Sequence, residues 1–200
     1  MSRFAAFSLE KYLRALSSSE PTPGGGSASA YVACLGMGLG EMAAQIGMKK
    51  VGSESKSVVL KAIQLLRKTR QKALQVVDLD PKVYASVLKS YQKARHFSDQ
   101  TKKARFIDEA LGNSFRLQAD LALLVVMARE AIQGIEGLIR GSIQNDLKVS
   151  RSFLEAAFRG AYDTAHINVV YLKDPQKRQR AESVLEELKK RFEINVVSKN

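Results

Sequence analysis

The stretch Pro21-Thr22-Pro23-Gly24-Gly25-Gly26-Ser27 precedes a long segment rich in small residues. Each proline ends the element before it, because proline fixes φ and lacks a backbone N–H. The glycines allow backbone conformations that other residues resist. Ser27 is predicted to cap a helix over residues 28–48 by accepting a hydrogen bond from a free amide of its first turn.

This expected helix contains Gly36, Gly38 and Gly40. Each glycine inside a helix costs about 1 kcal/mol relative to alanine. We therefore expect another segment to approach this helix closely. Gly36 and Gly40 have the spacing of paired membrane helices, but Glu41 and the flanking polar residues favour tight packing in a soluble core, so no membrane association is expected.

Composition favours one all-α domain spanning residues 1–200. The chain is 45% hydrophobic and 26% charged, with only 4 prolines and no strand-like alternation. Cys34 is the only cysteine, which excludes an internal disulfide and is typical of a reducing cytoplasmic setting. We expect Cys34 to be a small buried residue. Residues 1–16 have no long apolar stretch, so no signal peptide is expected.

The first half of the chain has the spacing of several helices. One is predicted over residues 4–16, and another begins at Ser55 or Ser57 after a basic turn. Residues 78–81 should break that helix, because proline disrupts a helix interior. Asp80 would then cap the following helix, with Pro81 as its first residue.

The second half continues the same pattern. Ser98 is a candidate cap for a long helix that extends to about Arg140, which Gly112 and Asn113 could interrupt. Residues 141–146 break the pattern, and another helix covers residues 147–172. Asp174-Pro175 starts the last helix. Long helices joined by short turns predict an antiparallel bundle.

The formal net charge of +12 is compatible with an anionic ligand or surface. The basic residues are spread along the chain, and no zinc-finger, helix-turn-helix or RNA-binding aromatic motif accompanies them. Nucleic-acid binding is therefore not expected. His96 and His166 lie far apart and lack cysteine partners, so no metal site is expected.

The glycine run lacks the residues of a nucleotide-binding loop. As the start of a helix, it presents free amides and a positive dipole end that favour an anion or polar ligand. The alternative is a tight structural turn. Asp80 and Asp146 both fall at expected helix starts, where carboxylates most often act as caps. A cap and a proton-transfer group are not exclusive.

Several motifs together resemble the formiminotetrahydrofolate cyclodeaminase and methenyltetrahydrofolate cyclohydrolase family over residues 4–175. They are the glycine motif, Lys49-Lys50 at the end of the small-residue helix, Asp80 with Tyr84, Asn145-Asp146-Leu147-Lys148, Gly160-Ala161 and Ile167-Asn168. Four features depart from the family's pattern: Asn145 replaces a serine, Lys148 replaces a glycine, Gly141-Ser142 replaces a Gly-Asn pair, and no proline occurs near Leu117–Gln118.

The resemblance implies a dimeric helical domain that acts on tetrahydrofolate one-carbon units without a metal or cofactor. One expected reaction closes 5-formiminotetrahydrofolate to 5,10-methenyltetrahydrofolate with release of ammonia. The other hydrolyses 5,10-methenyltetrahydrofolate to 10-formyltetrahydrofolate. The departures favour an alternative, a non-catalytic folate-binding or interaction protein on the same scaffold.

The resemblance also implies roles for individual residues. Asp146 is the first choice for general acid/base catalysis, and Asp80 is the second. Lys49 and Lys50 would hold the polyglutamate tail of the substrate. Asn168 would hydrogen-bond the ligand, or else form a buried bond between helices. The residues expected to line the pterin or the reacting centre are Pro23, Gly24, Gly25, Gly26 and Ser27.

Overall fold

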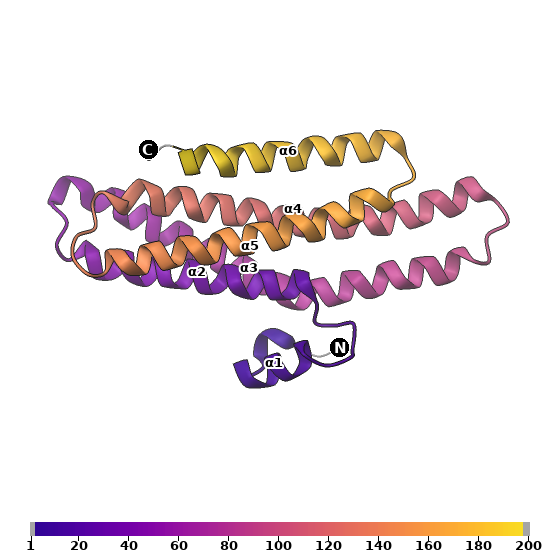
Figure 1. The fold of residues 1–200 in the computed structure, drawn as a ribbon, viewed down its shortest axis with the longest axis horizontal. Coiled ribbons are helices and arrows are strands. Elements are labelled where there is room, and N and C mark those ends of the chain that lie inside the picture. The colour runs from indigo at the N-terminus through magenta and orange to yellow at the C-terminus, as the bar shows by residue number, and fades with distance from the viewer. Residues whose placement is uncertain (1–2, 198–200) are drawn as a thin grey trace.

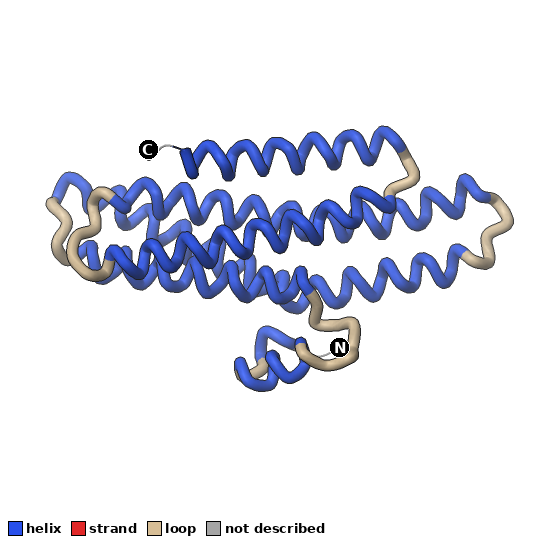
Figure 2. The backbone as a smooth tube through the Cα atoms, in the orientation of Figure 1, coloured by secondary structure: helices blue, strands red, loops and turns tan. Residues whose placement is uncertain are grey.

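The computed structural model describes residues 3–197, and of residues 194–197 only the backbone. Within that range the chain is helical and contains no strand, which confirms the all-α prediction (Figure 2). The elements are η1 (Phe4–Ala6), α1 (Leu9–Leu16), α2 (Gly25–Met48), α3 (Ser53–Ala94), α4 (Gln100–Glu136), α5 (Gln144–Tyr171) and α6 (Pro175–Val197).

The four long helices α2 to α5 form the predicted antiparallel bundle (Figure 1). α2 packs against α3 and α5, and α4 packs against the same two helices. α6 lies along the outer side of α4 and α5, whereas η1 and α1 lie below the start of α2. α3 and α4 extend beyond the start of α2, so this helix begins near the middle of the bundle (Figure 1).

Glycines on α2 allow α5 to approach closely, as the sequence predicts. A Cβ at Gly36 would lie 3.0 Å from the Leu154 side chain and 3.1 Å from the Ser150 carbonyl oxygen. The Ser150 hydroxyl donates to the Gly36 carbonyl at 2.6 Å. At Gly40 a Cβ would lie 2.9 Å from both Ile132 and the Ser150 hydroxyl. Gly38 differs, because its nearest neighbour is an ordinary contact with Arg70 at 3.5 Å.

A buried ion pair joins α2 to α3. Glu41 is only 5% exposed. Its carboxylate accepts hydrogen bonds from Arg67 Nε at 2.8 Å and from Arg70 Nη2 at 3.1 Å. Two guanidinium groups therefore compensate this buried charge, as an acid inside a helical core requires.

The predicted break at residues 78–81 is wrong. α3 runs without interruption from Ser53 to Ala94, with Pro81 inside it and Asp80 in the interior of the helix. A proline at this position cannot donate to the carbonyl of Val77, four residues earlier. That carbonyl instead accepts a hydrogen bond from the Ser27 hydroxyl of α2 at 3.0 Å. A partner from another helix thus replaces the bond that the proline removes.

Other helix boundaries also differ from the predicted ones. Asp99, rather than Ser98, caps α4 by accepting from the amides of Thr101 and Lys102. α4 passes through Gly112 and ends at Glu136, earlier than expected. The first predicted helix is divided into η1 and α1, with Ser8 as the cap of α1.

The last helix begins as predicted. The Asp174 carboxylate accepts from the amides of Gln176 and Lys177, at 2.9 Å and 3.2 Å. Among the described residues, no helix combines the length and the apolar character that a membrane span requires.

Cys34 is partly buried on α2, and its thiol lies 3.6 Å from the Arg70 carbonyl oxygen. Burial raises the pKa of this thiol to about 12. The thiol is therefore protonated at neutral pH and is a poor nucleophile.

The contact between α2 and α5 predicts opposite effects for two glycine-to-alanine changes. Gly36→Ala should lower the free energy of unfolding by about 1–3 kcal/mol, because the added methyl group meets a backbone oxygen and the branch of Leu154. Gly112→Ala in α4 meets nothing within 4 Å and should raise it by up to about 1 kcal/mol. Urea unfolding followed by circular dichroism measures both. Equal effects would contradict the close approach.

Candidate functional site

Ser27 lies in the first turn of α2 and connects this helix to α3. Gly24, not Ser27, occupies the N-cap position, so the predicted capping role of Ser27 is wrong. The Ser27 amide donates to Asp80 Oδ2 at 3.1 Å, and its hydroxyl donates to the Val77 carbonyl. A carboxylate from α3 thus satisfies an amide that a local cap would normally bind.

Asp80 belongs to α3 and hydrogen-bonds to both α2 and α4. Its second oxygen, Oδ1, accepts a hydrogen bond from Gln118 Nε2 of α4 at 2.7 Å. Burial raises the pKa of the Asp80 carboxyl, and the hydrogen bonds from the Ser27 amide and from Gln118 oppose that rise. The net shift is upward, which brings this group closer to the range where a carboxyl can both accept and donate a proton.

Gly26 leaves the space that this arrangement needs. A Cβ at Gly26 would lie 2.2 Å from both Asp80 Oδ1 and Gln118 Nε2. No side chain fits there unless these two groups separate. The third glycine of the motif is therefore required by the hydrogen bond between α3 and α4.

The N-terminal elements cover one side of this cluster. Ser27 has one hydroxyl proton, which it gives to Val77, so the Tyr12 hydroxyl donates to Ser27 Oγ at 3.1 Å. The Tyr12 and Tyr31 rings meet edge to face with centroids 4.4 Å apart. Burial raises the pKa of Tyr12, so its phenol is neutral at physiological pH.

Helix α5 borders the cluster on another side. The Thr164 hydroxyl would lie 3.7 Å from a Cβ at Gly25. Asn168, one turn further along, is 9% exposed and donates from Nδ2 to the Thr164 carbonyl at 2.7 Å. The observed bond of Asn168 lies within its own helix rather than between helices, and its Oδ1 makes no hydrogen bond within residues 3–197.

Two backbone amides in the first turn of α2 have no hydrogen-bond acceptor within the described residues. Ala28 donates to Gly24, and Ser27 donates to Asp80. The amides of Gly25 and Gly26 have no acceptor within the described part of the chain. Gly25 is also exposed, so a ligand can reach the end of the helix. Free amides at the positive end of a helix dipole bind anions and carbonyl oxygens.

Three predicted site residues lie at one end of the bundle, far from this cluster. Lys49 and Lys50 are exposed after the last turn of α2, whose 24 residues separate them from Gly24 by about 36 Å. Asp146 lies in the first turn of α5, and at 1.5 Å per residue it is about 33 Å from Asn168. Within one chain, the structure therefore brings Gly24–Ser27 and Asp80 together, with Asn168 nearby. Lys49, Lys50 and Asp146 lie away from this cluster.

Sequence reasoning missed Gln118, Thr164 and Tyr12. Gln118 is fully buried although glutamine rarely is, and it lies among the apolar residues of a long helix. Its position on the buried face of α4 was the available signal. No signal in the sequence relates Tyr12 to Ser27, because that contact depends on how α1 folds back against the bundle.

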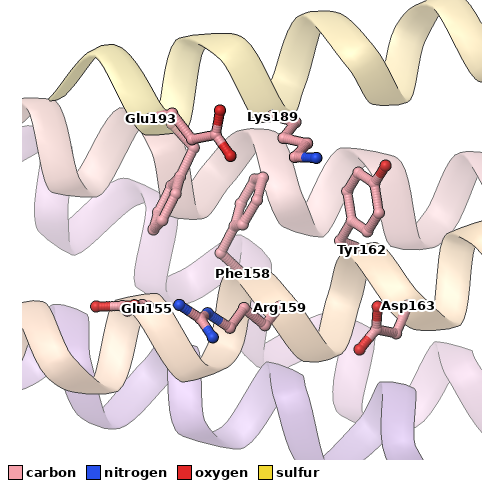
Figure 3. Close-up of a pocket in the computed structure, with 8 residues that line it drawn as sticks. Glu155, Phe158, Arg159, Tyr162, Asp163, Lys189 and Glu193 are labelled. Atoms are coloured by element: carbon pink, nitrogen blue, oxygen red, sulfur yellow. Dashed lines mark hydrogen bonds and ion pairs between the residues drawn. The ribbon is translucent and has the colours of Figure 1, made fainter. Parts of the chain in front are cut away.

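A cavity of about 620 Å³ lies between α5 and α6, away from this cluster. Figure 3 shows Phe158 pointing toward α6 and charged side chains on both rims. Phe158 stacks on Phe192 with centroids 4.0 Å apart, and the Arg129 guanidinium covers the Phe192 ring at 4.1 Å. None of the predicted site residues lines this cavity. In residues 3–197, no group of three or more His, Cys, Asp or Glu side chains is placed to hold a metal ion.

The crowding at Gly26 predicts a second glycine pair. Gly26→Ala should lower the free energy of unfolding by about 1–3 kcal/mol, because the methyl group separates Asp80 from Gln118. Gly25→Ala is the matched control, since its methyl group meets only an ordinary contact at 3.7 Å. Thermal unfolding measures both variants, and a Gly26→Ala protein as stable as Gly25→Ala would contradict the geometry.

The raised pKa of Asp80 predicts how stability depends on pH. The folded state holds the Asp80 proton more tightly than the unfolded state. Between the ordinary aspartate pKa and the raised value, the folded state therefore binds more protons, and Asp80 lowers stability as pH rises. Urea unfolding of wild type and Asp80→Asn across this window should show wild type losing stability relative to the variant. The opposite slope would mean that the pKa is depressed.

Comparisons with known proteins agree with this architecture. A family model described as formiminotransferase-cyclodeaminase matches residues 8–187. Formimidoyltransferase-cyclodeaminase of Mus musculus is 26% identical over 188 residues, covering 91% of this chain and 35% of that protein. The Gallus gallus protein is 24% identical over 190 residues, covering 90% of this chain and 35% of its own length.

The chain thus spans 35% of the length of these curated relatives. The crystal structure of formiminotetrahydrofolate cyclodeaminase from Thermotoga maritima has the same fold, with a TM-score of 0.85 at 19% identity over 95% of this chain and 92% of that one. Because the family model covers most of the sequence, this chain belongs to the formiminotransferase-cyclodeaminase family.

Proposed function

We propose that this chain is a folate one-carbon enzyme whose general acid/base is Asp80. The observation that carries the proposal is the partly buried Asp80 carboxyl beside the open first turn of α2, in a member of a cyclodeaminase family. Its substrate is 5-formiminotetrahydrofolate, which it closes to 5,10-methenyltetrahydrofolate with loss of ammonia, or 5,10-methenyltetrahydrofolate, which it hydrolyses to 10-formyltetrahydrofolate.

Both reactions pass through a tetrahedral carbon and need a proton to move. In the cyclodeaminase reaction, the departing nitrogen must gain a proton before it leaves as ammonia. In hydrolysis, water must lose a proton as it adds to the methenyl carbon. A carboxyl whose pKa is raised by burial is better suited to either transfer than an ordinary aspartate.

The first turn of α2 supplies the binding groups. The free amides of Gly25 and Gly26 suit a carbonyl oxygen of the pterin or an anionic group of the substrate. Pro23, Gly24 and Ser27 shape this turn, and Asn168 has an unused amide oxygen that can accept a hydrogen bond from the ligand.

Asp146, Lys49 and Lys50 enter the proposal differently. In one chain, Lys49 and Lys50 lie about 36 Å from Gly24, and Asp146 lies about 27 Å along α5 from Thr164, the residue beside Gly25, which favours Asp80 as the proton-transfer group. The lysines remain candidates for the acidic polyglutamate tail only if a second copy brings them near. A homodimer in the cytoplasm is part of the proposal, and Leu35, Met42 and Ile46 support it as apolar side chains 54%, 40% and 46% exposed on one face of α2.

The alternative function is a folate-binding or interaction protein without catalysis. Asn145 and Lys148, which depart from the family's pattern beside Asp146, are the observation that favours it. If Asp146 is needed for chemistry in relatives, these changes would remove activity and leave the glycine turn able to bind folate.

Turnover of both substrates, followed by ultraviolet absorbance, separates these functions. Asp80→Asn should lower kcat by about 10²-fold or more, the usual loss when a general acid or base is removed. Asp146→Asn, the matched change at the other end of the bundle, should retain activity within about tenfold of wild type. Circular dichroism melting confirms that both variants fold.

A large loss only in Asp146→Asn would overturn the assignment of Asp80. Absence of turnover with either substrate, together with saturable calorimetric binding of polyglutamyl folate, would favour the non-catalytic alternative. Absence of both turnover and binding would reject any folate role.

A further inference from the structure

Gln118 is a buried side chain of the cluster that uses only half of its hydrogen-bonding capacity. It is fully buried on α4, and its Nε2 donates to Asp80 Oδ1 at 2.7 Å. Its amide oxygen, Oε1, is also buried and has no hydrogen-bond partner among residues 3–197. A buried acceptor without a partner costs about 1–3 kcal/mol. This arrangement therefore needs an explanation other than stability.

We propose that Gln118 is a positioning residue that serves Asp80 in both of its protonation states. When Asp80 is ionised, the amide donates from Nε2 to Oδ1, as observed. When Oδ1 carries a proton, the amide turns half a revolution about its Cγ–Cδ bond, and Oε1 accepts the hydrogen bond from Oδ1–H. This inference rests on the proposed function only in that catalysis requires Asp80 to alternate between the two states.

The unpaired oxygen makes this exchange possible at little cost. The oxygen and nitrogen of an amide have nearly the same size, so a half turn needs no repacking of the side chains around it. Because Oε1 has no partner, the turn breaks no bond other than the one to Asp80. The Ser27 amide donates to Oδ2, so it can hold the carboxyl in place while Oδ1 gains or loses its proton.

Asp80 depends on Gln118 because its other neighbours are neutral. α1 contributes the Tyr12 phenol, α2 contributes Ser27, and α5 contributes Thr164 on the far side of Gly25. Asp78, two residues before Asp80 on α3, accepts from the Ala5 amide and lies near Arg3. No charged side chain in the described range hydrogen-bonds to Asp80. Neutral donors and acceptors must therefore accommodate its change of charge.

Nuclear magnetic resonance can follow the two partners without any substrate. The protein is labelled with ¹³C at the aspartate carboxyls and ¹⁵N at the glutamine amides, and Asp80→Asn and Gln118→Met assign the two resonances. The Gln118 amide should titrate with the same midpoint as the Asp80 carboxyl, and its downfield hydrogen-bonded proton should move upfield as Asp80 takes up a proton. In Asp80→Asn this titration of the Gln118 amide should disappear.

Gln118→Met distinguishes a two-way partner from a fixed donor. A fixed donor stabilises only the ionised carboxyl, so its removal should raise the Asp80 pKa by about one unit or more. A two-way partner stabilises both states, so we expect a change smaller than about half a unit. Gln133→Met, the same change elsewhere on α4, is the control and should leave the Asp80 titration unchanged.

A rise of a unit or more in Gln118→Met, or a Gln118 amide that does not titrate with Asp80, would overturn the proposal. If Gln118→Met does not fold, Gln118→Leu makes the same comparison of the Asp80 pKa. These readouts are independent of turnover. An inactive protein in which Gln118 and Asp80 titrate together would reject the proposed function and keep this inference. An active protein in which they do not titrate together would keep the proposed function and reject this inference.

Discussion

The close approach of α2 to its neighbours is the constraint on which this structure depends. Gly36 and Gly40 let α5 lie against α2, and Gly26 lets the side chains of α3 and α4 meet beside its first turn. Helices with larger side chains at these positions would stand further apart, since interaxial distances follow the side chains at the contact. At a larger separation, Ser27 could not reach Val77, and its amide could not reach Asp80. The helix cost of these glycines is offset by the contacts that they permit.

Hydrogen bonds join the glycine–serine motif at the start of α2 to the Asp80-Pro81 pair in the interior of α3. A proline inside a helix leaves a carbonyl without its donor, which ordinarily bends or ends the helix. Here the carbonyl of Val77 faces the start of α2, and the Ser27 hydroxyl replaces the missing donor. The same contact brings Asp80, the neighbour of Pro81, against the Ser27 amide. Ser27 and Asp80 thus lie together because each binds a backbone group of the opposite helix. Ser27 donates to the unpaired Val77 carbonyl of α3, and Asp80 accepts from the unpaired Ser27 amide of α2.

This interaction also explains which features were predictable. The helical pattern, the bundle and the close packing at Gly36 follow from local composition and spacing, and the structure confirms them. Local sequence predicts a helix break at Asp80-Pro81, and that prediction is wrong because the Ser27 hydroxyl replaces the donor that Pro81 lacks. Ser27 lies 50 residues from Val77 in sequence, so local patterns do not reveal this contact. Of the site, the glycine turn and Asp80 could be named in advance. Thr164 could not, and Gln118 offered only its place among the apolar residues of a long helix, because a polar residue joins a site only when the fold buries the helix face that carries it.

The charge of the chain and the chemistry of the site are separate properties. The net charge of +12 is compatible with an anionic ligand or surface, yet the groups around Asp80 are amides, hydroxyls and a neutral phenol. A cation next to Asp80 would hold its pKa low, so the carboxylate would be a weaker base and would stay ionised at neutral pH. Burial has the opposite effect and raises the pKa of this carboxyl, and the hydrogen bonds from the Ser27 amide and Gln118 oppose that rise only in part. The basic side chains therefore do not set the charge around Asp80, whose hydrogen-bond partners, the Ser27 amide and Gln118, are neutral.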